Sequence, residues 1–127
     1  MADSEKHFEL AVGIAIGALN AMLLVNGGAA TALIALMDKT DAKHNYTSAV
    51  ICFAAGAIFT VVGYCFGYFS QLNYANHRMS NENEQRSAAD HSHKWHRIWQ
   101  CLTLVAVGLA LAAMVLGLLV AAHLSNL

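Results

Sequence analysis

Histidine, which can bind metals or transfer protons, is enriched in this sequence. The 127 residues include seven histidines, and a neutral imidazole can bind a borderline metal or change charge near neutral pH. Asp90, His93 and His96 recur every three residues, which places them on one face of a helix. His77 would approach them from the opposite arm of a helical hairpin. These four residues are a candidate site for zinc or another divalent metal, or for a pH response.

A metal site is not the only interpretation of the histidines. The sequence contains no strict ligand motif such as H-E-x-x-H. The ordinary interpretation is a polar helix surface near the lipid headgroups, and it is the one we prefer. No cofactor is expected, and a divalent metal is kept as an alternative.

A second candidate set is polar and lies within apolar sequence. Asn20, Asn26 and Thr31 fall in a long apolar run, and an amide in hydrocarbon needs a hydrogen-bond partner. We expect interhelical hydrogen bonds, within the bundle or across a homo-oligomer. A pore in which these side chains face water is the alternative. The midplane of the runs has no Asp, Glu, Lys or Arg, which argues against a proton pump, a voltage sensor or a charge-coupled transporter acting alone.

The elements that position these residues are predicted to be membrane helices. Hydrophobic residues make up 57% of the chain and charged residues 12%, whereas soluble domains have about 25% charged residues. Three apolar runs exceed the roughly 20 residues that cross a bilayer. The prediction is an all-α membrane protein with one domain over residues 1–127. Its spans lie at about residues 8–37, 48–70 and 98–124.

The region between the second and third spans has the pattern of a helical hairpin. Leu72, Ala75 and Met79 continue an apolar face beyond the second span, and the absence of proline allows long helices. Helices two and three are therefore predicted to extend into a hairpin at about residues 71–97, with its turn at Asn81–Gln85. Asp38–Tyr46 is the predicted connection between the first two spans.

Lys and Arg in the short loops predict the orientation. The side that holds the N-terminus and the hairpin has five of these residues and the opposite side has two, which favours a cytoplasmic N-terminus. The five are Lys6, Arg78, Arg86, Lys94 and Arg97, and the two are Lys39 and Lys43.

Small residues recur at helical spacing in all three runs. In a membrane such residues let helices approach closely, so they predict helix packing within the chain or against a neighbouring chain. The glycines of this candidate packing set are Gly13, Gly17, Gly27, Gly28, Gly56, Gly63, Gly67 and Gly117.

Several function classes find no support in the sequence. The three cysteines have no metal-ligand spacing, and no catalytic constellation is recognisable, so an enzyme is not expected. A net charge of −1 without a basic patch gives no footprint for nucleic acid.

The segment Met22–Leu36, which reads MLLVNGGAATALIAL, resembles a segment found in many small, uncharacterised bacterial membrane proteins. These carry LL(I/V)NGGAAxALxA in their first span. The resemblance covers about fifteen residues. It implies a location in the bacterial inner membrane and no particular activity.

Three functions remain as hypotheses. The first is a small non-enzymatic membrane protein that self-associates in the lipid bilayer, as a pore or channel-like membrane effector. The second is an accessory subunit of a larger membrane complex, with another membrane protein as its partner. The third is a metal- or pH-responsive membrane protein that uses the histidines of the hairpin.

Overall fold

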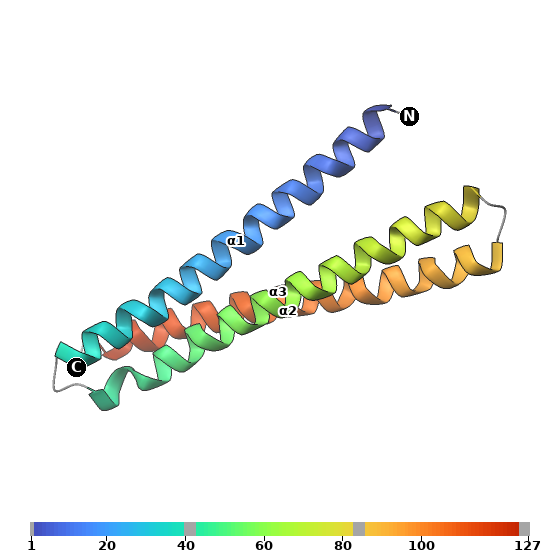
Figure 1. The fold of residues 1–127 in the computed structure, drawn as a ribbon. Coiled ribbons are helices and arrows are strands. Elements are labelled where there is room, and N and C mark those ends of the chain that lie inside the picture. Colours follow the sequence, from blue (N-terminus) through green and yellow to red (C-terminus); the bar gives the residue numbers. More distant parts are fainter. Residues whose placement is uncertain (1, 40–42, 83–85, 125–127) are drawn as a thin grey trace.

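The structure, a computed structural model, consists of three long α-helices in an antiparallel arrangement (Figure 1). Helix α1 spans Ala2–Lys39, α2 spans Lys43–Glu82 and α3 spans Arg86–Leu124. The backbone is described for residues 2–39, 43–82 and 86–124, and the side chains for residues 9–10, 12–37, 46–80 and 90–123. Over these residues the predicted all-α architecture is confirmed.

Each helix is long and apolar enough to cross a membrane. The helices have 38, 40 and 39 residues. At 1.5 Å per residue each is nearly twice as long as the roughly 30 Å hydrocarbon core. This is the architecture of a multi-pass membrane protein.

The helix boundaries differ from the prediction at the first connection. Helix α2 begins at Lys43, inside the segment Asp38–Tyr46 that was expected to be a loop. Two antiparallel helices need only a short link, and Lys43–Tyr46 contains no proline or glycine that would oppose a helix. Helix α2 continues past residue 70 to Glu82, and α3 begins at Arg86, before residue 98, so both helices are longer than the predicted spans. Of the predicted turn Asn81–Gln85, residues 81–82 belong to α2 instead, because nothing in them opposes a helix; residues 83–85 lie outside the described residues.

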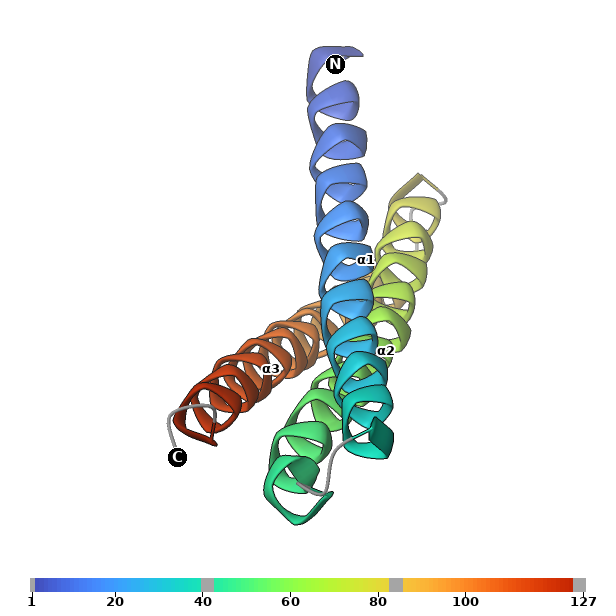
Figure 2. The same ribbon diagram turned by 90° about the vertical axis from the view of Figure 1, so that its left-hand side faces the viewer.

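Helices α2 and α3 form the main body of the molecule. They pack extensively against each other, whereas α1 packs mainly against α2 and makes few contacts with α3. Figure 2 shows the end of α1 near Lys39 beside α2 and apart from the end of α3. Toward its N-terminus α1 diverges from both other helices (Figure 1). The two halves of α1 therefore have different surroundings.

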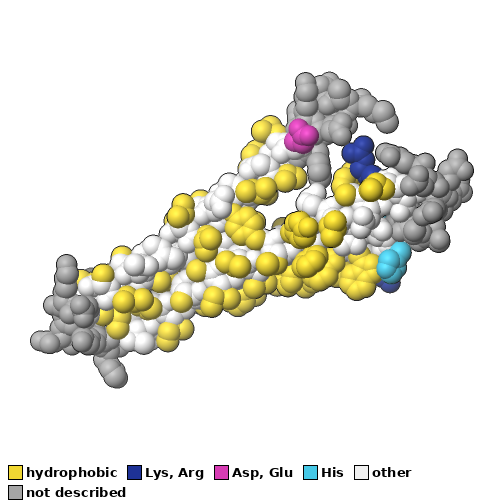
Figure 3. Space-filling view, viewed as in Figure 1, with side chains coloured by type: hydrophobic (Ala, Val, Ile, Leu, Met, Phe, Trp, Pro, Cys, Tyr) yellow, Lys and Arg dark blue, Asp and Glu magenta, His cyan; other side chains and the backbone are white. Residues whose placement is uncertain are grey.

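The surface is apolar along most of the molecule (Figure 3). Among the described side chains, every Asp, Glu, Lys and Arg lies at the end that holds the α2–α3 turn and the start of α1. These residues are Glu9, Arg78, Asp90, Lys94 and Arg97. An uncharged band of this length suits contact with lipid tails.

The three helices meet at Gly63 of α2. A Cβ atom at this position would lie 3.7 Å from Leu19 of α1, 3.7 Å from Ala106 of α3 and 3.8 Å from Val107 of α3. Small residues on α3, such as Ala106 and Ala110, are also buried. Without a strong hydrophobic force between helices in lipid, close approach through small residues provides the packing energy.

Gly56 makes a tighter contact than Gly63 does. A Cβ atom at Gly56 would lie 2.5 Å from Oδ1 of Asn26 in α1, which is far shorter than any ordinary contact. Gly56 and Gly63 belong to the same stripe of small residues on α2, yet only Gly63 has room for a methyl group.

We therefore expect Gly56→Ala to destabilise the bundle by about 1–3 kcal/mol, the usual cost of overpacking a close contact. The matched substitution Gly63→Ala should be neutral or slightly stabilising, because alanine favours a helix and its methyl group fits. Reversible unfolding of the purified protein in mixed detergent micelles measures both. Equal stability of the two variants would contradict the close approach of α1 and α2 at Gly56.

Candidate functional site

The polar residues of α1 are the first candidate site, and Asn20 contacts α2. The hydroxyl group of Tyr64 has one hydrogen, which faces two acceptors on α1: Oδ1 of Asn20 and, at 3.0 Å, the carbonyl oxygen of Ile16. Tyr64 is 44 residues from Asn20 and 48 residues from Ile16 in the sequence, so this contact joins α2 to α1. The expected interhelical hydrogen bond of Asn20 is therefore present, and Tyr64 provides it.

Asn26 is fully buried between α1 and α2. Its Nδ2 donates a 3.0 Å hydrogen bond to the carbonyl oxygen of Met22, one turn earlier in the same helix. Oδ1 has no hydrogen-bond partner in the part of the chain that the structure describes. It lies where the Cβ of Gly56 would be, so a Cα–H of Gly56 points at it and offers a weak C–H···O contact. Asn26 acts as a packing residue that fills the space left by glycine.

Thr31 completes the predicted polar set, but the three residues do not share one face. At about 100° per residue, Asn20 and Thr31 lie about 20° apart around the helix axis, whereas Asn26 lies about 120–140° from both. Thr31 is exposed, and its hydroxyl group donates a 2.9 Å hydrogen bond to the carbonyl oxygen of Gly27. Asn26 is therefore buried against α2, Asn20 reaches α2 only through the hydroxyl group of Tyr64, and Thr31 bonds within α1.

The predicted packing glycines divide into two groups. Those of α2 and α3 contact neighbouring helices within the chain, since a methyl group added at any of them would have a side chain within 4 Å: Gly56, Gly63, Gly67 and Gly117. The glycines of α1 have no described atom within that distance: Gly13, Gly17, Gly27 and Gly28. Packing among the described residues therefore uses only the first group. Packing of the α1 glycines against another chain stays a prediction.

Aromatic residues join α2 to α3 where their apolar segments end. The ring of Trp99 lies 5.6 Å from that of Phe66, 5.1 Å from that of Phe69 and 6.3 Å from that of Trp95, measured between centroids. Aromatic pairs at such distances stabilise by about 0.5–1.5 kcal/mol each beyond the area they bury. Tryptophan is also a residue type that favours the boundary between membrane and water.

A buried polar contact lies beside the aromatic cluster. The side chain of Ser70 is 3% exposed, and its Oγ lies 2.9 Å from Nδ1 of His96. The same Nδ1 lies 2.8 Å from the carbonyl oxygen of Ser70. A carbonyl oxygen only accepts, so Nδ1 of neutral His96 carries the proton and donates it there. The imidazole of His96 therefore has a structural role in the hairpin.

The candidate metal residues come together only in part. The rings of His77 and His93 lie 5.1 Å apart across the hairpin, and those of His93 and His96 lie 6.5 Å apart along α3. Asp90 is exposed on α3. Among the described residues, no group of three or more His, Cys, Asp and Glu side chains is placed to hold a metal ion. The described geometry gives the metal hypothesis no support.

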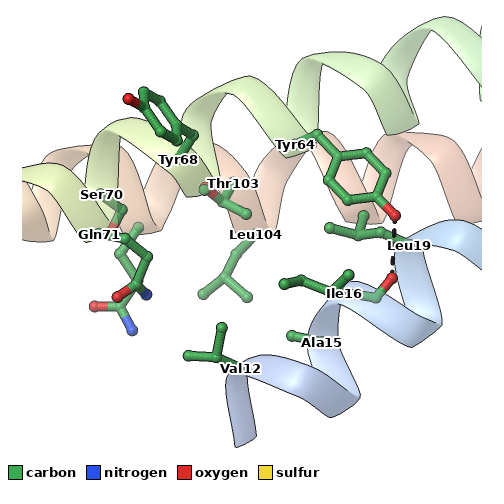
Figure 4. Close-up of a pocket in the computed structure, with 12 residues that line it drawn as sticks. Val12, Ala15, Ile16, Leu19, Tyr64, Tyr68, Ser70, Gln71, Thr103 and Leu104 are labelled. Atoms are coloured by element: carbon green, nitrogen blue, oxygen red, sulfur yellow. Dashed lines mark hydrogen bonds between the residues drawn. The ribbon is translucent and has the colours of Figure 1, made fainter. Parts of the chain in front are cut away.

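A pocket of about 410 Å³ lies where α1 diverges from the other two helices. Figure 4 shows Tyr64 at one end, where it reaches Ile16 of α1, and Gln71 toward the other end. Most of the lining is apolar, with hydroxyl and amide groups from α2 and α3. The lining residues are Val12, Ala15, Ile16, Leu19, Tyr64, Gly67, Tyr68, Ser70, Gln71, Gln100, Thr103 and Leu104.

Sequence reasoning missed Tyr64, Ser70 and the pocket. Tyr64 carries a hydroxyl group within an apolar run, which is a signal that it needs a partner. Nothing in the sequence says that this partner is Asn20. The pocket depends on the angle at which α1 leaves α2, and no residue pattern records that angle.

The chain matches no protein-family model, and it has no match among curated proteins or solved structures.

Tyr64→Phe tests the contact of α1 with α2. Loss of this shared hydrogen bond should destabilise the bundle by about 0.5–1.5 kcal/mol, since interhelical hydrogen bonds in membranes are of this size. Tyr68→Phe is the matched control, because Tyr68 is exposed and its hydroxyl group makes no hydrogen bond within the described residues. Unfolding in mixed micelles should separate the two variants. A Tyr64→Phe protein as stable as the control would show that the hydroxyl group does not hold α1.

Proposed function

We propose that this protein is a non-enzymatic membrane protein that self-associates in the bilayer through the face of α1 that its own chain leaves uncovered. This face carries Gly13, Gly17, Leu24, Gly28 and Thr31. At about 100° per residue these side chains fall within about 60° of one another around the axis. All five are exposed.

The observation that carries the proposal is the two-sided character of α1. The buried residues Leu19, Asn26 and Ala30 face α2, and the glycine face lies on nearly the opposite side of the helix. In membrane helices, small residues are concentrated at helix–helix interfaces, because they let the backbones of two helices come close. A second helix on this face would give α1 a neighbour on both sides.

A second copy of α1 is a suitable occupant of this face. The four-residue step from Gly13 to Gly17 is repeated from Leu24 to Gly28, and such spacing is typical of a self-complementary helix seam. We place the N-terminus and the α2–α3 hairpin in the cytoplasm on the basis of the Lys and Arg distribution. The resemblance of Met22–Leu36 to bacterial segments supports a bacterial inner membrane as the location.

We expect the paired substitutions Gly17→Ile and Gly28→Ile to weaken self-association by about tenfold, which corresponds to about 1.4 kcal/mol. Neither glycine has a described atom within 4 Å of a methyl position, so the chain itself should fold normally. Gly108→Ile on α3 is the matched control, since Gly108 also has open space around it. Resonance energy transfer between labelled copies in vesicles, measured against dilution in lipid, gives the affinity.

A monomeric wild-type protein in vesicles would overturn the proposal. If a different membrane protein is instead extracted with the wild-type chain in a fixed ratio, and the Gly17→Ile and Gly28→Ile chain loses it, the role of accessory subunit replaces self-association. Equal weakening by Gly108→Ile would show that bulk in any span, and not this face, is responsible.

A pore is a second candidate function, favoured by the position of two polar side chains on the same side of α1. Asn20 and Thr31 are both exposed and lie about three turns apart along the axis. In a ring of several copies this side could face a central channel, where both side chains would contact water. Their hydrogen bonds with Tyr64 and Gly27 also satisfy them without a channel.

Leakage from vesicles tests the pore. If copies of α1 line a channel, the wild-type protein releases entrapped ions, and Asn20→Leu with Thr31→Val reduces the release by about tenfold because the lining loses its polar groups. Tyr64→Phe is the control, since it removes the same hydrogen bond from Asn20 but leaves the amide in place. Vesicles that stay tight with assembled wild-type protein would exclude the pore and leave self-association standing.

A further inference from the structure

The pocket between α1 and the α2–α3 pair has the size of a ligand site. Its volume of about 410 Å³ lies within the range of about 300–1,000 Å³ that small-molecule sites occupy. Figure 3 shows the hollow between the diverging part of α1 and the rest of the molecule. It lies on a different side of α1 from the glycine face, and it adjoins the Ser70–His96 contact through Ser70.

The two ends of the pocket differ in polarity. At the end near Tyr64, the walls are Ile16 and Leu19 of α1 and Leu104 of α3. At the other end lie the side-chain amides of Gln71 and Gln100. Both glutamines are exposed, and within the described residues no hydrogen bond involves either amide. Figure 4 shows Gln71 extending from α2 into the space that faces Val12 of α1.

The polar end of the pocket lies at the level where the helices leave the hydrocarbon. Gln71 directly follows the span predicted for α2 (residues 48–70), and Gln100 lies in the first turn of the span predicted for α3 (residues 98–124). Trp95 and Trp99 lie at the same level of α3, within the aromatic cluster described above. Since tryptophans collect at the membrane boundary, the glutamine end is at that boundary and the Tyr64 end is deeper. Tyr64 lies about 10 Å further into the hydrocarbon, because seven residues of α2 separate it from Gln71.

The geometry points to a phospholipid as the ligand of this pocket. One acyl chain would lie between α1 and α3 against Ile16, Leu19 and Leu104. The ester groups of the glycerol region, which accept hydrogen bonds, would meet the amide donors of Gln71 and Gln100. An apolar cavity of this kind does not hold water favourably, and lipid is the solvent on its open side. The lipid would act as a wedge that keeps the start of α1 apart from the hairpin.

The polar groups of the lining favour a lipid chain over a small polar ligand. Hydrogen bonds to Asn20 and Ile16 already engage the hydroxyl group of Tyr64, and contacts with His96 engage Ser70. The hydroxyl group at the deep end, that of Tyr64, is therefore already bonded, and so is the hydroxyl group of Ser70 beside Gln71. The amides of Gln71 and Gln100, which no described residue engages, are where a ligand's polar atoms can be satisfied. Their position sets the direction in which an amphiphile enters.

The test uses the full chain in vesicles of phosphatidylethanolamine and phosphatidylglycerol. The protein is extracted into mild detergent, washed free of bulk lipid and analysed by native mass spectrometry. We expect about one phospholipid to remain bound per chain, because the chain has one such pocket in its described part. Ala15→Phe, which places a ring in the pocket, should lower this retention about tenfold, equivalent to about 1.4 kcal/mol of binding free energy. Ala112→Phe, at an exposed position of α3 outside the pocket, should retain the lipid.

A second variant keeps the test decisive if Ala15→Phe disturbs the fold. Gln71→Leu with Gln100→Leu changes two exposed side chains and should also reduce retention, because the ester groups lose their donors. Wild-type retention of no lipid, or equal retention by the wild type, Ala15→Phe and the double glutamine variant, would overturn the proposal. Replacement of phospholipid by free fatty acid in the bound fraction would overturn the assignment to a phospholipid. Gly17→Ile should keep the lipid, so loss of self-association and loss of this site are distinguishable.

Discussion

The close approach of α1 to α2 at Gly56 and Gly63 is the contact on which the position of α1 depends. In lipid, an apolar side chain gains little by leaving the membrane for a helix surface, so helices associate where their backbones can come close. Gly56 accepts the amide of Asn26, and Gly63 accepts Leu19 of α1 as well as Ala106 of α3. Gly63 thus determines where both neighbours of α2 pack. The hydrogen bonds of Tyr64 then hold α1 at one further point.

Because α1 is attached mainly along α2, its remaining surface is available. Its glycine face has open space around Gly13, Gly17 and Gly28, and its N-terminal half leaves a pocket beside α3. Both features follow from the same geometry. Had α1 packed into the groove between α2 and α3 along its whole length, Val12 and Ile16 would contact α3 directly and the pocket would be absent. The proposed self-association and lipid binding use different sides of this one weakly attached helix.

The far end of the α2–α3 hairpin is held by different chemistry. Aromatic stacking around Trp99 and the hydrogen bonds between Ser70 and His96 replace the glycine contacts found within the spans. The buried polar groups of this contact have partners. His96 therefore has a structural role in this histidine-rich segment.

The sequence by itself determined the number of helices, their antiparallel order and the presence of helix beyond the spans. These features depend on apolar run length, on the absence of proline and on the apolar face that Leu72 and Met79 continue. The small-residue stripes of α2 and α3 were also visible, because close packing within a membrane requires them.

Only the tertiary structure decided which residues meet. It turned Asn26 toward Gly56, paired Asn20 with Tyr64, and left the α1 glycines uncovered. The physical reason is that residue patterns are local, whereas the rotation and crossing angle of a helix result from side chains on two helices at once. Lipid accepts nearly any apolar face, so the pattern of a single helix does not say which face its own chain will cover.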